Sequence, residues 1–204
     1  MLWPLSKSIH VLRTKQTEDE YEKLALAAAE LFQHLVDQYY DGEITLDELE
    51  EKFRDGLRET YAVIMLTALG DRREVTEQDL AWIEERLARE FAYLDEFVVD
   101  MESGNYSRPR ALWRAGLYGF PRQAWTQFSV PDGAVELMGV IPSDVCMGSV
   151  LCGCIFDVEI DIDGGMAVWW VLDPAKESCE VCIAGAVASP YYFSPDEVRR
   201  VTGA

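Results

Sequence analysis

Five cysteines are the side chains with the clearest potential chemistry, and four of them form two closely spaced pairs. Cys152 and Cys154 make a CxC motif, while Cys179 and Cys182 make a CxxC motif. A short-spaced pair of thiolates can occupy one edge of a tetrahedron, so two such pairs predict a structural Zn²⁺ site. Cys146 is a fifth thiol and an alternative ligand.

Two other interpretations of these cysteines stay open. Cysteine is also a small hydrophobe that packs well in cores, and CxC is a less common zinc motif than a second CxxC. Cys179 and Cys182 are in addition a candidate redox pair, although no thioredoxin-like βαβ pattern surrounds them. The N-terminus lacks the apolar stretch of a signal peptide, which indicates a reducing compartment and favours metal over a disulfide.

A β-hairpin is expected to position the cysteines. Residues 156–163 alternate between apolar and acidic side chains, residues 163–165 are Asp-Gly-Gly, and residues 166–172 are rich in β-branched and aromatic side chains. This pattern is typical of two antiparallel strands joined by a tight turn. We interpret the acidic row as the solvent face of a half-buried strand, because apolar and polar side chains alternate with period two.

The pairing of these two strands determines where the cysteines meet. If Ile162 faces Met166 across the turn, Cys154 falls opposite Pro174. The CxxC motif starts only a few residues further on. The sequence therefore predicts that both cysteine pairs lie at the open end of one hairpin.

The chain before residue 130 has a helical pattern. Capping boxes at residues 17–20, 45–48 and 76–79 each precede a long stripe of apolar residues at three- and four-residue spacing. A fourth helical region begins near Ser107, breaks at residues 119–121 and resumes as far as Phe128.

These elements predict an α+β fold in three parts. We expect an extended arm over residues 1–16, an antiparallel helical bundle over residues 17–130, and a Cys-rich, zinc-ribbon-like β module over residues 131–204. The arm is either a frayed terminus, which is the commoner case, or a strand on a sheet edge. Ser194 to Glu197 is a start signal for a short C-terminal helix.

The charge distribution suggests one segment for contact with partners. The net charge of −19 argues against a general nucleic-acid coat, which would need Lys and Arg to meet phosphate. From residue 105 to 130 there is no Asp or Glu, and this segment carries the candidate partner-binding residues Arg108, Arg110, Arg114, Arg122, Trp113 and Trp125. It either contacts nucleic acid by charge and stacking or, as we favour, packs its aromatic residues on the bundle while its arginines balance the acidic surface.

Other candidate sites are weaker. Residues 37–48 are a near miss to a calcium-binding EF-hand, but Tyr39 occupies a ligand position, and a helix–turn–helix linker explains every residue. The only histidines, His10 and His34, lie in no catalytic motif, and phosphate-binding and dinucleotide-binding motifs are absent. We therefore predict that the protein is not an enzyme. No apolar run is long enough to predict a membrane span.

The order of these parts resembles tailed-bacteriophage minor capsid, or head-morphogenesis, proteins. The resemblance covers most of residues 20–190, and its motifs are DGEIT at 41–45, ALG at 68–70, FAYLDEF at 91–97, ESGN at 102–105, RAGLYG at 114–119, WWVL at 169–172 and CEVC at 179–182. Many of the proteins it resembles have a CxxC motif first and a CxC motif last, and here the CxC motif comes first. The C-terminal module is therefore either permuted or part of a divergent branch.

The resemblance implies a structural role. It implies a low-copy virion protein that binds the phage portal or the major capsid protein during head assembly in the host cytoplasm, with self-association as a further contact. The protein would contact nucleic acid only through residues 105–128. The alternatives are a cellular zinc-ribbon-bearing interaction module and, third, a thiol redox enzyme or metal hydrolase.

Overall fold

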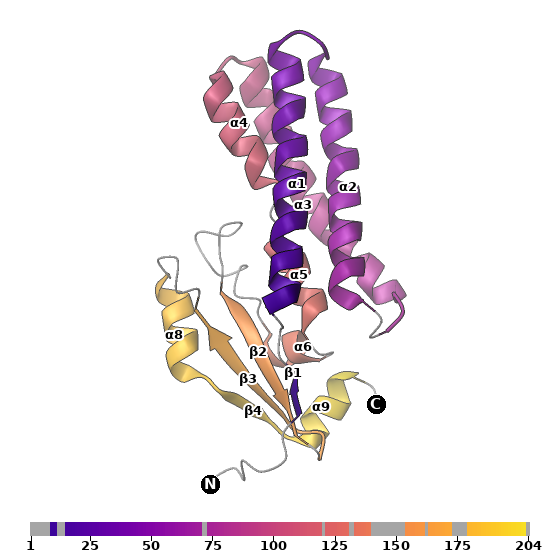
Figure 1. Ribbon diagram of the computed structural model, residues 1–204, viewed down its shortest axis with the longest axis vertical. Coiled ribbons are helices and arrows are strands. Elements are labelled where there is room, and N and C mark those ends of the chain that lie inside the picture. The colour runs from indigo at the N-terminus through magenta and orange to yellow at the C-terminus, as the bar shows by residue number, and fades with distance from the viewer. Residues whose placement is uncertain are drawn as a thin grey trace. The chain divides into compact units, whose positions relative to one another are not determined.

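The computed structural model describes residues 9–11, 15–70, 73–119, 121–130, 133–139, 154–161, 163–172 and 179–202. The chain divides into a helical unit, residues 18–124, and a sheet unit, residues 1–17 together with 125–204. Figure 1 shows long helices in the first unit and a small antiparallel sheet with short helices in the second. The predicted α+β class is confirmed. Of the extended arm that we expected, residues 9–11 form a strand of the sheet unit.

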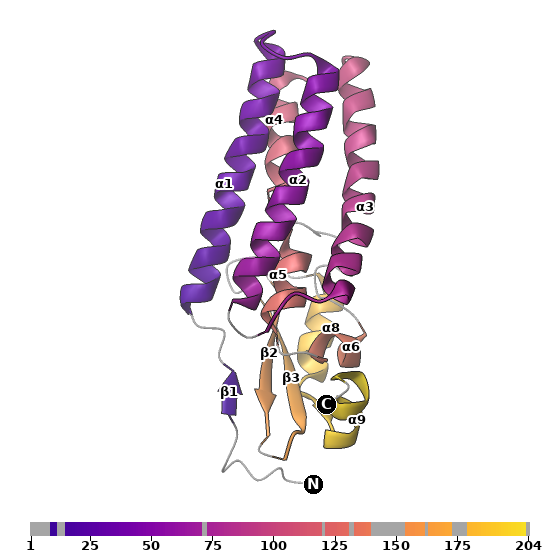
Figure 2. The same ribbon diagram turned by 90° about the vertical axis from the view of Figure 1, so that its right-hand side faces the viewer.

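The helical unit is built from consecutive helices that run up and down. They are α1 (Lys15–Tyr40), α2 (Leu46–Leu69), α3 (Glu77–Glu102) and α4 (Arg108–Leu117), followed by the start of α5 (Arg122–Ser129). Figure 2 shows α1, α2 and α3 side by side, joined by short loops. Such loops make consecutive helices antiparallel neighbours.

Local capping chemistry explains where α2 and α3 begin. The Thr45 side chain accepts a hydrogen bond from the Glu48 N–H at 3.2 Å, and the Thr45 N–H donates to Glu48 Oε2 at 2.8 Å. The same reciprocal pair joins Thr76 and Asp79, so both predicted capping boxes are confirmed. The start expected at Thr17 is wrong, because α1 already begins at Lys15.

Four aromatic rings form the centre of the helical unit. Phe32 of α1, Phe53 of α2, Phe97 of α3 and Tyr118 at the end of α4 have neighbouring ring centroids 4.8–6.2 Å apart. Each ring comes from a different helix, so this one contact region joins all four helices. Aromatic pairs at such distances stabilise a fold beyond the area that they bury.

The described residues of the sheet unit form four antiparallel strands in chain order: β1 (Ile9–Val11), β2 (Ile155–Ile160), β3 (Met166–Val171) and β4 (Tyr191–Phe193). The predicted strands β2 and β3 pair. Ile9 of β1 lies opposite Ile160 of β2. Of our two alternatives for the arm, edge pairing therefore describes residues 9–11, although we considered a frayed terminus the commoner case.

The register of the β2–β3 hairpin differs from our expectation by two residues. Ile160, not Ile162, lies opposite Met166. The loop is longer than predicted, because the Asp161 N–H donates to the Gly165 carbonyl at 2.8 Å and the Gly164 N–H donates to the Asp161 carbonyl at 2.9 Å. A shift of two residues leaves every side chain on its predicted face, because the side-chain period of a strand is two.

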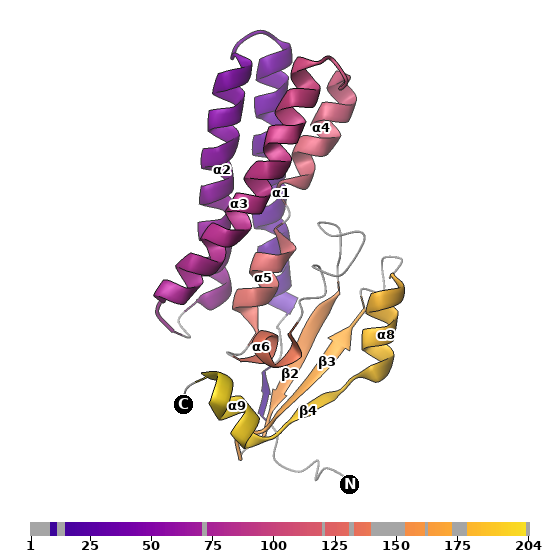
Figure 3. The same cartoon turned by 180° about the vertical axis from the view of Figure 1, so that it is seen from behind.

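The sheet unit also contains helices. They are α6 (Ala134–Met138), α8 (Glu180–Ala188) and α9 (Pro195–Thr202). Figure 3 shows the chain passing from α8 through β4 into α9. The helix α9 was predicted, and Ser194 and Glu197 form its capping box. Our expectation that the other residues after 131 form strands and turns is wrong for α6 and α8. Within the described part of the chain, no helix has the length and apolar character needed to cross a membrane.

Candidate functional site

Three of the predicted zinc ligands lie in or against one hydrophobic core cluster of the sheet unit. Cys154, directly before β2, is 4% exposed, and Cys182, in the first turn of α8, is fully buried. Cys179 is the N-cap residue of α8 and packs against the same cluster. The structure therefore brings Cys154 and Cys182, which are 28 positions apart, into one region. A zinc site made of the two cysteine pairs requires this proximity.

The packing of α8 on the sheet explains this convergence. Cys154 shares a strand face with Phe156, whose ring meets the Trp170 ring of β3 edge-on at 5.5 Å. A Cβ atom at Gly185 would overlap the Trp170 ring, so α8 approaches β3 as closely as only glycine permits. Cys182 lies almost one turn before Gly185 on the same buried helix face. Cys154 and Cys182 are therefore on the same side of the sheet.

The described residues alone do not make a metal site. None of the three described cysteines is in a disulfide. Among the residues that the structure describes, no group of three His, Cys, Asp or Glu side chains is placed to hold a metal ion. The other two predicted ligands, Cys152 and Cys146, lie outside the described residues. Zinc therefore stays a prediction, in which Cys152 supplies the thiolate that completes the set.

The α8 helix adds chemistry that the sequence did not reveal. The N-terminus of a helix stabilises a thiolate, because unpaired N–H groups and the helix dipole favour negative charge there. Cys179 is half-buried at this position, and Cys182 is buried behind it. This arrangement suits a thiolate ligand of a metal and also the attacking thiolate of a dithiol pair.

Arg108 binds two carboxylates at the α1–α2 loop. Its Nε donates to Asp37 at 2.7 Å, and its two terminal nitrogens donate to Asp41 at 2.7 and 3.0 Å. These hydrogen bonds raise the pKa of Arg108 and lower the pKa of Asp41. Two carboxylates of the calcium-like loop are thus used to attach α4 to α1, and Glu48 caps α2, which agrees with the helix–turn–helix interpretation.

The other candidate arginines lie over tyrosine rings of the helical unit. Arg110 is 4.6 Å from the centroid of Tyr106, Arg114 is 6.0 Å from that of Tyr118, and Arg122 is 4.7 Å from that of Tyr21. Such cation–π contacts hold a guanidinium group against the bundle. Only 8% of Arg122 is exposed. These positions resemble the packed arrangement that we favoured over a nucleic-acid surface.

The two candidate tryptophans have opposite environments. Trp113 of α4 is 61% exposed, whereas Trp125 of α5 is buried with 1% exposed. The structure therefore does not present the six predicted partner-binding residues as one surface. Trp113 is the aromatic member of the set that a partner can reach.

One half-buried acid, Glu90, was missed by the sequence analysis. Tyr61 of α2 donates a hydrogen bond to Glu90 of α3 at 3.2 Å, and burial raises the pKa of both groups. Glu90 lies between Leu87 and Leu94 at three- and four-residue spacing, on the apolar stripe of α3. An acidic residue on an apolar stripe is a sequence signal that could have identified it.

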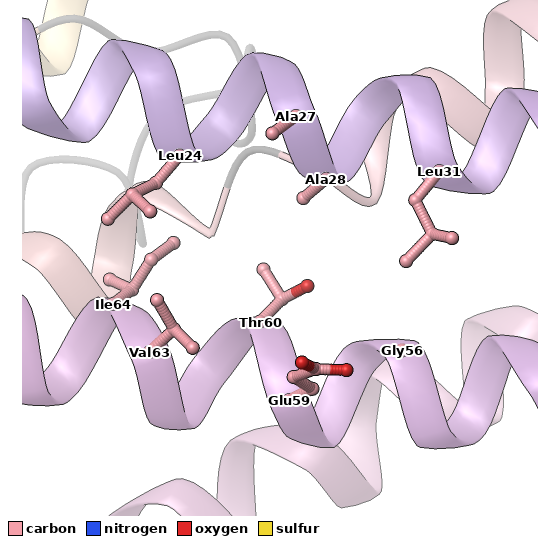
Figure 4. Close-up of a pocket in the computed structure, with 9 residues that line it drawn as sticks. All are labelled: Leu24, Ala27, Ala28, Leu31, Gly56, Glu59, Thr60, Val63 and Ile64. Atoms are coloured by element: carbon pink, nitrogen blue, oxygen red, sulfur yellow. The ribbon is translucent and has the colours of Figure 1, made fainter.

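Two apolar surfaces on the described residues are open to partners. The first is the outer surface of α8, which we define as Val181, Ile183, Ala184, Val187 and Ala188, all exposed. The second is the α1–α2 groove, a hollow of about 220 Å³. Figure 4 shows it between the facing sides of these two helices. Its lining residues are Leu24, Ala27, Ala28, Leu31, Gly56, Glu59, Thr60, Val63 and Ile64.

Comparison with known proteins finds no matching family model, no matching curated protein and no matching solved structure. The resemblance to phage minor capsid proteins is thus untested by these comparisons and remains a hypothesis from sequence motifs.

Proposed function

We propose that this protein is a structural component that works through protein–protein contacts, as a minor capsid or portal-associated protein of a tailed phage head. One observation carries the contact role: the outer surface of α8. A helix that is apolar on all sides is normally buried. Val187 is nevertheless 82% exposed, Val181 48% and Ile183 45%. Glu180 is the only charged residue of the helix.

The phage role rests on the resemblance of the sequence motifs, and the α8 surface supports only the more general contact role. The proposed partners are the portal or the major capsid protein, with self-association as a further contact. The proposed locations are the host cytoplasm during assembly and then the phage head. A structural Zn²⁺, held by Cys154, Cys179, Cys182 and Cys152, would cross-link the sheet unit and so stabilise α8 on the sheet.

A cellular zinc-ribbon-like interaction module is the second candidate, and the α8 surface supports it equally. A thiol redox enzyme is favoured by a different observation, the position of Cys179 at the N-terminus of α8. Tightly bound zinc favours a structural cysteine site over a redox pair. A Cys179–Cys182 disulfide that forms reversibly favours the enzyme.

The experiment is coexpression of the chain with the portal and major capsid proteins encoded in the same genome, followed by gradient purification of heads. We expect the chain to sediment with heads. The test variant is Val187→Glu, and the matched control is Val99→Glu, which changes an exposed valine of α3 that is 58% accessible. A buried, unpaired carboxylate is costly, so Val187→Glu should reduce incorporation at least tenfold and Val99→Glu less than twofold.

Two outcomes would contradict the proposal. If the wild-type chain is missing from purified heads, the virion role is wrong. If both variants are incorporated equally, the outer surface of α8 is not the contact. Far-UV CD of each variant checks that the fold is retained.

A further inference from the structure

The α1–α2 groove has the dimensions of a helix-binding site. On α1, Leu24, Ala27, Ala28 and Leu31 face the groove at positions i, i+3, i+4 and i+7. The α2 residues that line it are Gly56, Glu59, Thr60, Val63 and Ile64 (Figure 4). Seven residues of helix span about 10 Å, which is two turns. A partner helix that lies along the groove presents its own side chains at the same spacing.

The groove is apolar but too small to enclose a whole small molecule. Leu31 is 42% exposed and Val63 is 38% exposed, so both are available for contact. Pockets for small ligands usually measure about 300–1,000 Å³. The volume of about 220 Å³ is better filled by a few side chains that enter from a neighbouring helix.

Glu59 indicates the charge of that helix. It is the only charged residue that lines the groove, it is exposed, and it has no ion pair with any described residue. Elsewhere on α2, Arg54 pairs with Glu50 and Arg58 with Asp55, so both arginines of this helix are already engaged. A cation from a partner would pair with Glu59 beside an apolar surface.

The charge of the whole helical unit favours the same kind of partner. Residues 18–124 contain 25 Asp and Glu but only 12 Lys and Arg. A second helical unit would bring a surface of the same sign to the groove, and the resulting repulsion opposes self-association at this site. A basic helix would be attracted instead.

We propose that the α1–α2 groove binds an amphipathic helix of another protein, which has apolar residues at i, i+3, i+4 and i+7 and a Lys or Arg that faces Glu59. This inference rests on the proposed contact role and names the chemistry of one partner. It does not depend on the phage assignment or on the α8 surface.

The probe is a synthetic 18-residue helical peptide with Leu on one face and Lys beside it, compared with the same peptide carrying Glu in place of Lys. Binding to the full chain is measured by fluorescence anisotropy at about 0.15 M salt, where long-range attraction is screened. The Lys peptide should bind at least tenfold more tightly than the Glu peptide. If the Lys peptide does not bind at millimolar protein, or if both peptides bind equally, the proposal is wrong.

Two matched pairs of variants locate the binding site. Ala27→Trp fills the groove, and Ala88→Trp places the same side chain at an exposed alanine of α3. Glu59→Lys reverses the charge of the groove, and Glu96→Lys makes the same change at an exposed position of α3. We expect the Lys peptide to bind at least tenfold more weakly to Ala27→Trp and about fivefold more weakly to Glu59→Lys, because an ion pair beside an apolar surface contributes about 1 kcal/mol. The affinity of the two α3 variants for the Lys peptide should fall by less than twofold.

Equal losses for Glu59→Lys and Glu96→Lys would show general attraction between opposite charges. Equal losses for Ala27→Trp and Ala88→Trp would show that the peptide does not bind in the groove, and either result would overturn the site. Sedimentation velocity of the unliganded chain provides a second test. If the chain is a dimer that Ala27→Trp dissociates, the occupant is a second copy and the proposed partner is wrong. Because these measurements use no phage component and leave α8 unchanged, their failure is distinguishable from failure of the head-incorporation experiment.

Discussion

Replacing Asp79 by Asn should lower the free energy of unfolding of the helical unit by about 2 kcal/mol at pH 7. Asp79 is 7% exposed, and its carboxylate accepts hydrogen bonds from both terminal nitrogens of Arg73, at 2.6 and 2.9 Å. It also accepts from the Thr76 N–H at 2.8 Å. The Arg73 guanidinium and these bonds lower the pKa of Asp79 from 3.8 to about 2.

The magnitude follows from this pKa difference. Each pKa unit corresponds to about 1.4 kcal/mol, so a shift of nearly two units gives about 2 kcal/mol after allowance for the partly exposed Arg73 side chain. Because the folded-state pKa is depressed, the stabilisation is fully present above pH 4 and is lost as the pH falls towards 2. About half of it should remain at pH 3.

Urea unfolding followed by far-UV CD provides the assay. With a slope of about 2 kcal/mol per molar urea, Asp79→Asn should lower the midpoint by about 1 M at pH 7 and by about half as much at pH 3. Glu77→Gln, at an exposed position in the same helical turn, is the control for general charge effects. An unchanged midpoint at pH 7 would refute the stabilising role of the Arg73–Asp79 contact. A loss that is equally large at pH 3 would show that the ionised carboxylate is not its source.

Two further predictions test one unit each: the helix packing of the helical unit and the metal of the sheet unit. A Cβ at Gly119 would overlap backbone atoms of Ala29, so Gly119→Ala should lower the unfolding free energy by about 3 kcal/mol. The control is Gly116→Ala, which should lower the unfolding free energy by less than about 1 kcal/mol. At this position the new methyl group meets only the end of the Gln33 side chain, at 2.8 Å, and alanine favours the helix. If urea unfolding shows equal losses of free energy for the two variants, this account is contradicted. Elemental analysis should find about one zinc per wild-type chain, and Cys182→Ser should abolish zinc binding and near-UV CD of the sheet unit while the far-UV signal of the bundle persists. A Cys182→Ser variant that keeps full near-UV CD and melting behaviour would contradict the structural metal.

Much of the helical unit could be predicted because its determinants are local. The capping boxes at Thr45 and Thr76 bond residues only three positions apart, and they place the starts of α2 and α3 without reference to any distant residue. The break at residues 119–121 likewise separates α4 from α5 as expected. The alternation of residues 156–163 predicted the strand β2 and its buried face, because that face depends only on period two.

Two features of the candidate cysteine site could not be predicted without the tertiary structure: the helix α8 and the register of the β2–β3 hairpin. The segment 180–188 is apolar on every side, so no helical period distinguishes it from a buried strand. Its helical form places Cys179 at an N-terminus and Gly185 against Trp170, and neither position follows from the spacing of the cysteines. The observed hairpin register differs from the predicted one because hydrogen bonds in the loop, and not the alternation of the strands, decide which residues face each other.

By itself, the sequence determined the α+β class, the limits of most helices and the buried face of β2, because each depends on contacts between residues a few positions apart. Only the tertiary structure decided which distant residues meet. Ile9 pairs with Ile160, Arg108 binds Asp37 and Asp41, and Tyr61 donates to Glu90. Many acidic and aromatic residues in this chain are chemically equivalent candidates for such contacts. The choice among them is made by packing of the whole unit, which local patterns do not encode.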